Sequence, residues 1–222
     1  EIKIMPVKRE RRVAVIGAGV AGLAAAKTAA ERGNSVTIFE AYSRIGGQFN
    51  IAKNVPGKSE FLETLRYFQT LIEKMKIDLR LSCTATAEQF NNNDFDAVIL
   101  ASGVLPRRPM IVGIEEPHVF GYAEILNGQA EVGPRAVIIG GGGIAFDVAL
   151  FLLEANDLSF VDPGAFRRRW GIDQASPDVT PRHQITMLQR SEGPMGRHLG
   201  KSTGWIHRAI LKQHCVRQLS GV

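Results

Sequence analysis

The residues best suited to chemistry in this sequence form two glycine-rich patterns, each placed between a run of β-forming side chains and an alanine-rich or apolar run. They read Gly17-x-Gly19-x-x-Gly22 and Gly140-x-Gly142-x-x-Ala145. At a strand-to-helix turn, glycine lets the backbone approach a phosphate, and the N–H groups at the helix start favour an anion. One such turn is a weak signal, whereas two predict an enzyme that handles two dinucleotides.

Several residues that follow the first turn favour a flavin dinucleotide, FAD, as its ligand. Glu40 closes the next strand, where a carboxylate accepts hydrogen bonds from the ribose of an adenosine. The paired glycines before Gln48, of which Gly47 is the second, let the backbone approach a flat ligand, and domains that bind only nicotinamide do not need such a loop. Further candidate contacts are Lys58, for which a solvated lysine is the alternative, the backbone at Ala85, and Gly103.

The second turn differs from the first in the charge that follows it. The next strand ends in Gln189 and Arg190, with no acid in the place of Glu40. An acid there would repel a 2′-phosphate, and an arginine would pair with it. The pattern therefore predicts NADP(H) over NAD(H), with Arg190 as the main contact. The further candidates are Arg197, Lys201 and Trp205. A solvated basic face is the alternative for Arg190, Arg197 and Lys201.

Composition excludes several other classes of function. The net charge of +5 could indicate nucleic acid, but the basic residues are scattered and no aromatic platform accompanies them, so we expect no nucleic-acid partner. Two cysteines, Cys83 and Cys215, stand far apart without a ligand-type neighbour, which argues against a disulfide framework or a metal site. No apolar run approaches the roughly 18 residues that span a bilayer, so we expect a cytoplasmic protein. We expect no catalytic residue and no metal ligand in the chain.

The elements that must position these residues alternate between strand and helix. The apolar patterns predict strands at residues 13–16, 35–39, 77–81, 97–101, 135–139, 184–188 and 216–219, and helices at 20–32, 60–76, 122–126, 144–154 and 203–213. This order predicts an α/β fold of two Rossmann-like dinucleotide-binding domains, residues 1–108 and 109–222. Because the chain starts at Glu1 and stops as a new strand begins, we expect a fragment truncated at its C-terminus.

The chain resembles the bacterial NADPH-dependent 2,4-dienoyl-CoA reductases along essentially its whole length. The resemblance is carried by GAGVAGLAAAKTAAERGNSVTIFEA, IGGQFNIAKNVPGKSEF, LASGVLPR, IIGGGGIAFDVA, WGID, MLQR and GKSTGWIHR. It implies that NADPH gives a hydride to FAD and that electrons pass singly through an iron–sulfur cluster to FMN, which reduces the dienoyl-CoA. FMN, the cluster and the substrate would all lie in a preceding barrel of the same polypeptide, outside this sequence.

The resemblance also assigns residues to the two cofactors. It implies that FAD is lined by Gly17, Gly19, Ala21, Gly22, Glu40, Gln48, Lys58 and Ala85. It implies that NADPH is lined by Gly140, Gly142, Gly143, Arg190 and Trp205. Two alternatives stay open: a non-catalytic module that holds an adenine nucleotide, as in relatives of the trimethylamine dehydrogenase type, and a flavin-free reductase with two nicotinamide sites.

Overall fold

The computed structural model describes residues 3–92, 94–154, 162–169, 172 and 182–222. The chain divides into two units. The first consists of Glu1–Lys53 with Glu60–Arg108, and the second consists of Asn54–Ser59 with Pro109–Val222. Each unit contains one sheet of parallel strands with a glycine turn at the carboxyl end of one strand.

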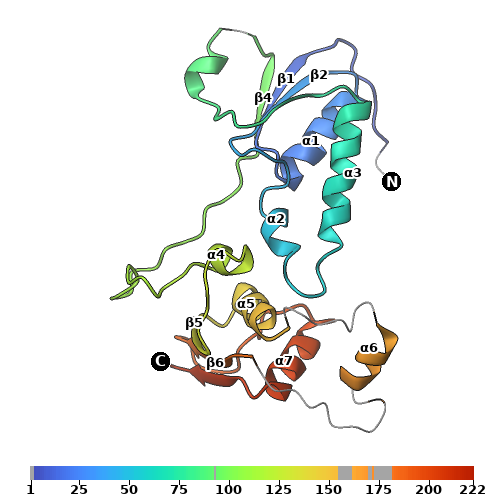
Figure 1. Ribbon diagram of the computed structural model, residues 1–222. Coiled ribbons are helices and arrows are strands. Elements are labelled where there is room, and N and C mark those ends of the chain that lie inside the picture. Colours follow the sequence, from blue (N-terminus) through green and yellow to red (C-terminus); the bar gives the residue numbers. More distant parts are fainter. Residues whose placement is uncertain (1–2, 93, 155–161, 170–171, 173–181) are drawn as a thin grey trace. The chain divides into compact units, whose positions relative to one another are not determined.

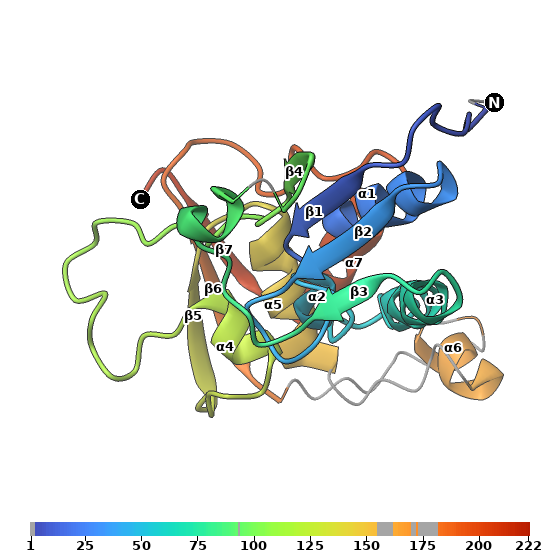
Figure 2. The same cartoon turned by 90° about the horizontal axis from the view of Figure 1, so that it is seen from above.

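The first unit is a four-stranded parallel sheet in the order β3-β2-β1-β4 (Figures 1 and 2). Its strands are β1 (Arg12–Ile16), β2 (Ser35–Phe39), β3 (Asp78–Arg80) and β4 (Ala97–Leu100). Its helices are α1 (Val20–Glu31), the short α2 (Phe49–Ala52), α3 (Phe61–Lys74) and a 3-10 turn (Ala87–Phe90). Helix α1 packs on β1 and β2, and α3 lies beside α1.

The core of the first unit lies between the sheet and these two helices. Val15 and Ile38 are fully buried on neighbouring strands, and Leu23 of α1 and Phe68 of α3 close over them. Removing an aliphatic or aromatic side chain of this size from water contributes about 1.5–3 kcal/mol. This core fixes the end of β1, and therefore the turn that follows it.

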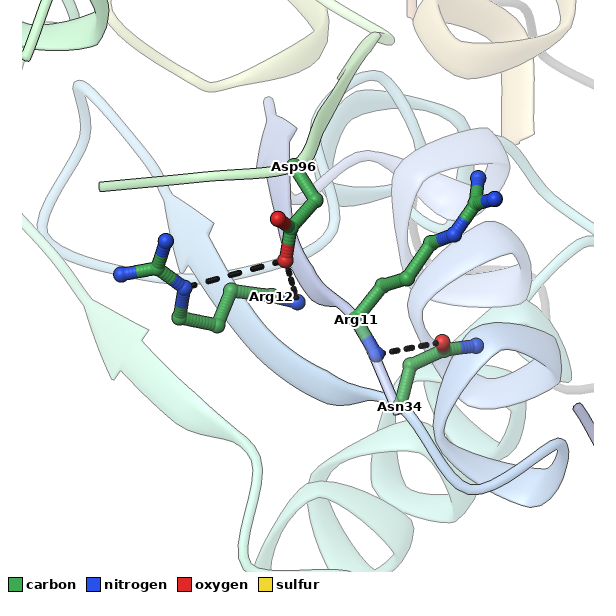
Figure 3. A network of polar contacts seen from close by, with 4 residues as sticks. All are labelled: Arg11, Arg12, Asn34 and Asp96. Carbon is green, nitrogen blue, oxygen red and sulfur yellow. Dashed lines mark hydrogen bonds and ion pairs between the residues drawn. The ribbon is translucent and has the colours of Figure 1, made fainter. Parts of the chain in front are cut away.

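A polar network ties the start of β1 to its neighbours (Figure 3). The backbone N–H of Arg12 donates to Asp96 Oδ2 at 2.7 Å, and that of Arg11 donates to Asn34 Oδ1 at 3.2 Å. The Arg12 N–H, and after it the positive charges of Arg12, Arg9 and Arg11, hold the pKa of Asp96 below its ordinary value. The network fixes the register at which β1 enters the sheet.

The second unit is a three-stranded parallel sheet in the order β5-β6-β7. Its strands are β5 (Arg135–Ile139), β6 (Gln184–Gln189) and β7 (Arg217–Ser220). Its helices are α4 (Tyr122–Leu126), α5 (Gly143–Glu154), α6 (Pro163–Arg169) and α7 (Gly204–Gln213). Helix α5 contacts β5, α4 and α7 and carries more of the unit's buried side chains than any other described element, among them Phe146 and Leu150.

The observed elements confirm the predicted α/β class with parallel Rossmann-like sheets. Of the described helices of four to seven residues, α4 was predicted, whereas α2, the turn at Ala87–Phe90 and α6 were missed, because so short a segment shows little helical period. Among the described residues, no helix is long and apolar enough to cross a membrane. The same part of the chain contains no group of three acidic, histidine or cysteine side chains that could hold a metal ion.

Candidate functional site: two glycine turns

The glycines of the first turn serve two different purposes. Gly17 has a φ of +103°, and a Cβ on it would overlap the carbonyl oxygen of Ala101. A Cβ on Gly22, in the first turn of α1, would overlap the carbonyl oxygen of Gly17. Around Gly19, in contrast, a Cβ would meet no atom within 4 Å. The fold requires the first and third glycines, whereas the second leaves open space where a phosphate could approach the backbone.

The paired-glycine loop lies directly against this open space. Gly46 forms a parallel bridge with Gly19, and its N–H donates to the carbonyl oxygen of Ala18 at 2.8 Å. A Cβ on Gly47 would stand 3.1 Å from the Cα of Gly19. Both loop glycines have a positive φ, +114° and +49°. The loop therefore continues the glycine surface begun by the turn, as expected for a site that receives a long, flat ligand.

The carboxylate of Glu40 stabilises the first turn by accepting hydrogen bonds from the backbone. Its side chain is buried, with 6% of its surface exposed. Oε2 accepts the backbone N–H of Ala18 at 2.7 Å, and Oε1 accepts that of Tyr42 at 2.9 Å. An ionised carboxylate has further lone pairs, so these bonds leave acceptor capacity for a ribose. The ribose contact itself stays a prediction.

Other predicted residues of the first site gather near the same turn. The Gln48 side chain donates to the carbonyl oxygen of Val104 at 3.1 Å, beside Gly103, whose φ is +73°. The segment before the half-buried Ala85 is hydrogen-bonded to Glu40, because the Cys83 N–H donates to the Glu40 carbonyl oxygen at 2.8 Å. Ala21 is exposed in the first turn of α1.

Lys58 belongs to the second of the two units. Its Nζ is 2.7 Å from each carboxylate oxygen of Asp147 on α5, with the two side chains 32% and 22% exposed. The sequence analysis missed Asp147, because the two residues are 89 positions apart and no local pattern links them. The ion pair attaches the segment that carries Lys58 to α5.

The second turn shares strand register and a backbone hydrogen bond with the first, and it differs at the residue that follows the neighbouring strand pair. Gly17 donates its N–H to Phe39 and Gly140 donates to Leu188, both at 2.8 Å, and the strand registers pair the preceding residues in the same way. The residue after Leu188, Gln189, therefore holds the position of Glu40. Its Oε1 lies where a Cβ on Gly141 would be, and its Nε2 donates to the carbonyl oxygen of Ser191 at 2.8 Å. A neutral amide replaces the carboxylate.

A small hollow of about 90 Å³ opens beside this second turn. It is lined by Gly141, Gly142, Gly143, Gln189, Ser191, Gly196, Arg197, His198 and Leu199. Gly142, like Gly19, has no atom within 4 Å of a Cβ position. Of the basic candidates, only Arg197 is among the lining residues. Arg190, Lys201 and Trp205 are not among them, and all four of these candidates, Arg197 included, are exposed.

Comparison with known proteins identifies the family to which this chain belongs. The family model described as pyridine nucleotide-disulphide oxidoreductase matches residues 11–221, which is nearly the whole chain. The chain belongs to the pyridine nucleotide-disulphide oxidoreductase family. This membership confirms the Rossmann-like fold and supports the oxidoreductase class that the two turns predict.

Three relatives of this oxidoreductase domain illustrate its range. A bilirubin reductase of Mediterraneibacter gnavus is 40% identical over 154 residues, which are 69% of this chain and 24% of that protein. A metal reductase of Desulforamulus reducens is 31% identical over 230 residues, 99% and 34% of the two chains. The solved complex of 2-naphthoyl-CoA reductase with 2-naphthoyl-CoA is 27% identical, with a TM-score of 0.78 over 99% of this chain and 29% of that one. The domain thus spans about a quarter to a third of the length of these relatives.

Proposed function

We propose that this chain is the electron-input module of a larger flavoprotein, which binds FAD at the first glycine turn and NADPH at the second. The observation that carries the proposal is the exchange of Glu40 for Gln189 at positions that strand register and the N–H bonds of Gly17 and Gly140 make equivalent. A carboxylate accepts hydrogen bonds from ribose hydroxyls and repels a 2′-phosphate, whereas an amide has no charge to repel it. The first turn therefore suits the adenosine of FAD, and the second suits the phosphorylated ribose of NADPH.

The residues of the first site fit FAD in shape as well as in charge. The space at Gly19 admits a pyrophosphate, and the loop at Gly46 and Gly47 offers backbone without side chains to the rest of the dinucleotide. Bound FAD would supply the one chemistry that amino-acid side chains lack here, namely acceptance of a hydride and release of its electrons one at a time. The chain's own task is to bind and orient the two dinucleotides.

The reaction of the whole protein is the reduction of a 2,4-dienoyl-CoA in the cytoplasm, through an iron–sulfur cluster and FMN in a preceding barrel. This part rests on the resemblance carried by IGGQFN, PGK and GKSTGWIHR. It is supported by the greater length of the relatives and by the likeness to 2-naphthoyl-CoA reductase, whose name also specifies an acyl-CoA substrate. The acyl-CoA would bind to the barrel and not to the two turns described above.

Rapid mixing of the purified full-length protein with NADPH, without oxygen, tests the proposal. We expect loss of the flavin absorbance, faster with NADPH than with NADH by about tenfold or more, the ratio that a difference of 1.4 kcal/mol gives. A flavoprotein that neither nucleotide bleaches would instead be a nucleotide-binding module without electron input. A colourless protein would indicate two nicotinamide sites, and faster bleaching by NADH would contradict the assignment of the second turn. Addition of dienoyl-CoA to the reduced protein tests the substrate separately.

A further inference from the structure

One short segment from the first half of the chain is built into the second unit. Asn54–Ser59 belongs to the second unit, although Lys53 before it and Glu60 after it belong to the first. We propose that the ion pair of Lys58 with Asp147 positions the two dinucleotides for hydride transfer, because it anchors this segment to helix α5. Both are positioning residues, which contact neither dinucleotide. The inference rests on the proposed function, since it specifies what that hydride transfer requires.

Two side-chain contacts hold Asn54–Ser59 in the second unit. Lys58 Nζ lies 2.7 Å from each carboxylate oxygen of Asp147 on α5. The Asn54 side chain donates to the carbonyl oxygen of Leu126 at 2.9 Å, at the end of α4, where the last helical carbonyls lack an N–H donor within the helix. Val55, between the two contacts, is buried with 2% of its surface exposed. Because α4 packs against α5, both contacts fix the segment to the same pair of helices.

The anchor on α5 lies at the end of the helix that we assign to the nucleotide. Helix α5 begins at Gly143, and Asp147 follows about one turn later. Phe146 and Val148, its neighbours in sequence, are buried at 1% and 7% exposure, so the core of the second unit fixes the backbone that carries the carboxylate. The ion pair therefore attaches the segment close to the second glycine turn.

The two ends of the segment lead to the flavin loop of the first unit. Helix α2 starts at Phe49, directly after Gln48, and α3 starts at Phe61. The rings of Phe49 and Phe61 stack with their centroids 4.4 Å apart and an interplanar angle of 28°. This stack closes the base of the segment. A displacement of the segment is therefore transmitted to Phe49 and to the neighbouring Gln48, which we predict to contact the flavin.

Peptide bonds that join the two units restrain the distance between their ligands. Hydride transfer needs the reacting atoms within about 3.5 Å, and a misplacement of about 1 Å can cost about 100-fold in rate. The chain passes between the units at Lys53–Asn54, at Ser59–Glu60 and at Arg108–Pro109. Near the last passage, Leu105 and Met110 are 87% and 102% exposed. The first two passages, which flank the anchored segment, therefore restrain the dinucleotides more than the third does.

Single-turnover reduction of FAD by saturating NADPH, in the full-length protein without oxygen, tests the positioning role. We expect Lys58→Met and Asp147→Asn each to lower the rate constant about tenfold, and the double variant to lower it no further, because one restraint is lost in all three. Lys58→Arg should keep the rate constant within about threefold, since a guanidinium can bind the same carboxylate through two N–H groups. Lys27→Met and Glu31→Gln are the matched controls: they break an ion pair of 2.6 Å and similar exposure within α1 and should not change the rate constant.

Binding measurements separate positioning from direct contact with a ligand. We expect the affinity of the apoprotein for FAD, and its calorimetric affinity for adenosine 2′,5′-bisphosphate, to change less than about twofold in Lys58→Met and in Asp147→Asn. Weaker FAD binding in Lys58→Met but not in Asp147→Asn would overturn the inference in favour of a direct contact of Lys58 with FAD. Effects on the rate constant that multiply in the double variant would also overturn it, because the two residues would then act independently.

Hydrogen exchange of backbone amides distinguishes failure of this inference from failure of the proposed function, because it requires no hydride transfer. We expect Asp147→Asn to speed exchange at least about fivefold in Asn54–Ser59 and also in α2 of the first unit, with no change in the Lys27→Met control. Faster exchange in Asn54–Ser59 alone would reveal a local contact and would overturn the connection to the flavin loop. A wild-type flavin that NADPH does not bleach would contradict the proposed function, whereas the exchange pattern would still report on the connection.

Discussion

Replacing single glycines of the first turn by alanine should separate the folding of this domain from its binding of FAD. In Gly22→Ala the new methyl group would overlap the carbonyl oxygen of Gly17 and stand 3.3 Å from the Cβ of Ala101. Backbone oxygen cannot move aside as a flexible side chain can, so the overlap costs about 3 kcal/mol, the upper end for overpacked sites. Alanine also stabilises the helix by about 1 kcal/mol relative to glycine, because it is the better helix former. The net loss is about 2 kcal/mol of unfolding free energy.

Gly19→Ala should have the opposite profile. Gly19 precedes α1 with φ −68° and ψ 172°, an extended conformation that alanine adopts without strain, and its Cβ would meet no atom within 4 Å. The expected change in stability is the cost of alanine at a helix N-cap, about 0.5–1 kcal/mol. The methyl group occupies the space that we assign to the pyrophosphate, so FAD affinity should fall at least about 30-fold, or about 2 kcal/mol.

The assay compares the two variants with the wild-type protein after FAD has been removed, because bound ligand stabilises the folded state by mass action. Unfolding in urea gives the stability of each apoprotein, and titration with FAD, followed by flavin fluorescence, gives its affinity. Gly142→Ala, which also meets no atom within 4 Å, is the matched control: it should leave FAD binding intact and weaken NADPH. Unchanged FAD affinity in Gly19→Ala, or wild-type stability in Gly22→Ala, would refute the division of roles between the glycines.

Three further predictions concern charges. A double-mutant cycle of Lys58→Met and Asp147→Asn, read by urea unfolding, should give a coupling of about 1–2 kcal/mol, because the pair is short and only partly exposed. Gln189→Glu should raise the KM for NADPH well above that for NADH in the flavin-reduction assay, since a carboxylate repels the 2′-phosphate. Ionised Asp96, whose pKa is lowered, stabilises the fold above about pH 4, and this stability is lost as pH falls through the lowered pKa. Asp96→Asn should therefore flatten the dependence of Tm on pH in that range.

Each of the three charge predictions has a control that tests its stated cause. The exposed pair of Glu63 and Arg66 on α3, with side chains 62% and 78% exposed, should couple by less than about 0.5 kcal/mol, and an equal coupling in the two pairs would contradict the effect of burial. Gln189→Met removes the same hydrogen bonds as Gln189→Glu without adding charge, so equal effects of both changes on NADPH would exclude repulsion. A Tm difference between Asp96→Asn and the wild-type protein that stays constant below pH 4 would exclude the lowered pKa as its cause.

The fold could be predicted largely from local patterns, because strands and helices of ordinary length carry their own periodicity. The strands Ser35–Phe39 and Arg135–Ile139 have the predicted bounds, as does the short helix Tyr122–Leu126, and the other predicted elements differ by one or two residues at an end. The four-residue helix Phe49–Ala52 was not predicted, because it is shorter than the repeat that would reveal it. Its position follows from the preceding glycine loop, whose conformation is set by contacts with the first turn.

For the candidate site, the sequence alone determined which kind of structure each glycine pattern forms and which charge follows it. Glycine spacing and a closing Glu40 or Gln189 are local features, and a strand-to-helix turn is built from consecutive residues.

Only the tertiary structure decided which atoms meet across distant segments. It distinguished Gly19, which faces open space, from Gly22, which faces a carbonyl oxygen, and it paired Lys58 with Asp147. It also placed Arg197 at the hollow, through a loop that is fixed to the buried ring of Phe146. Such contacts depend on strand register and core packing, which no short stretch of sequence contains.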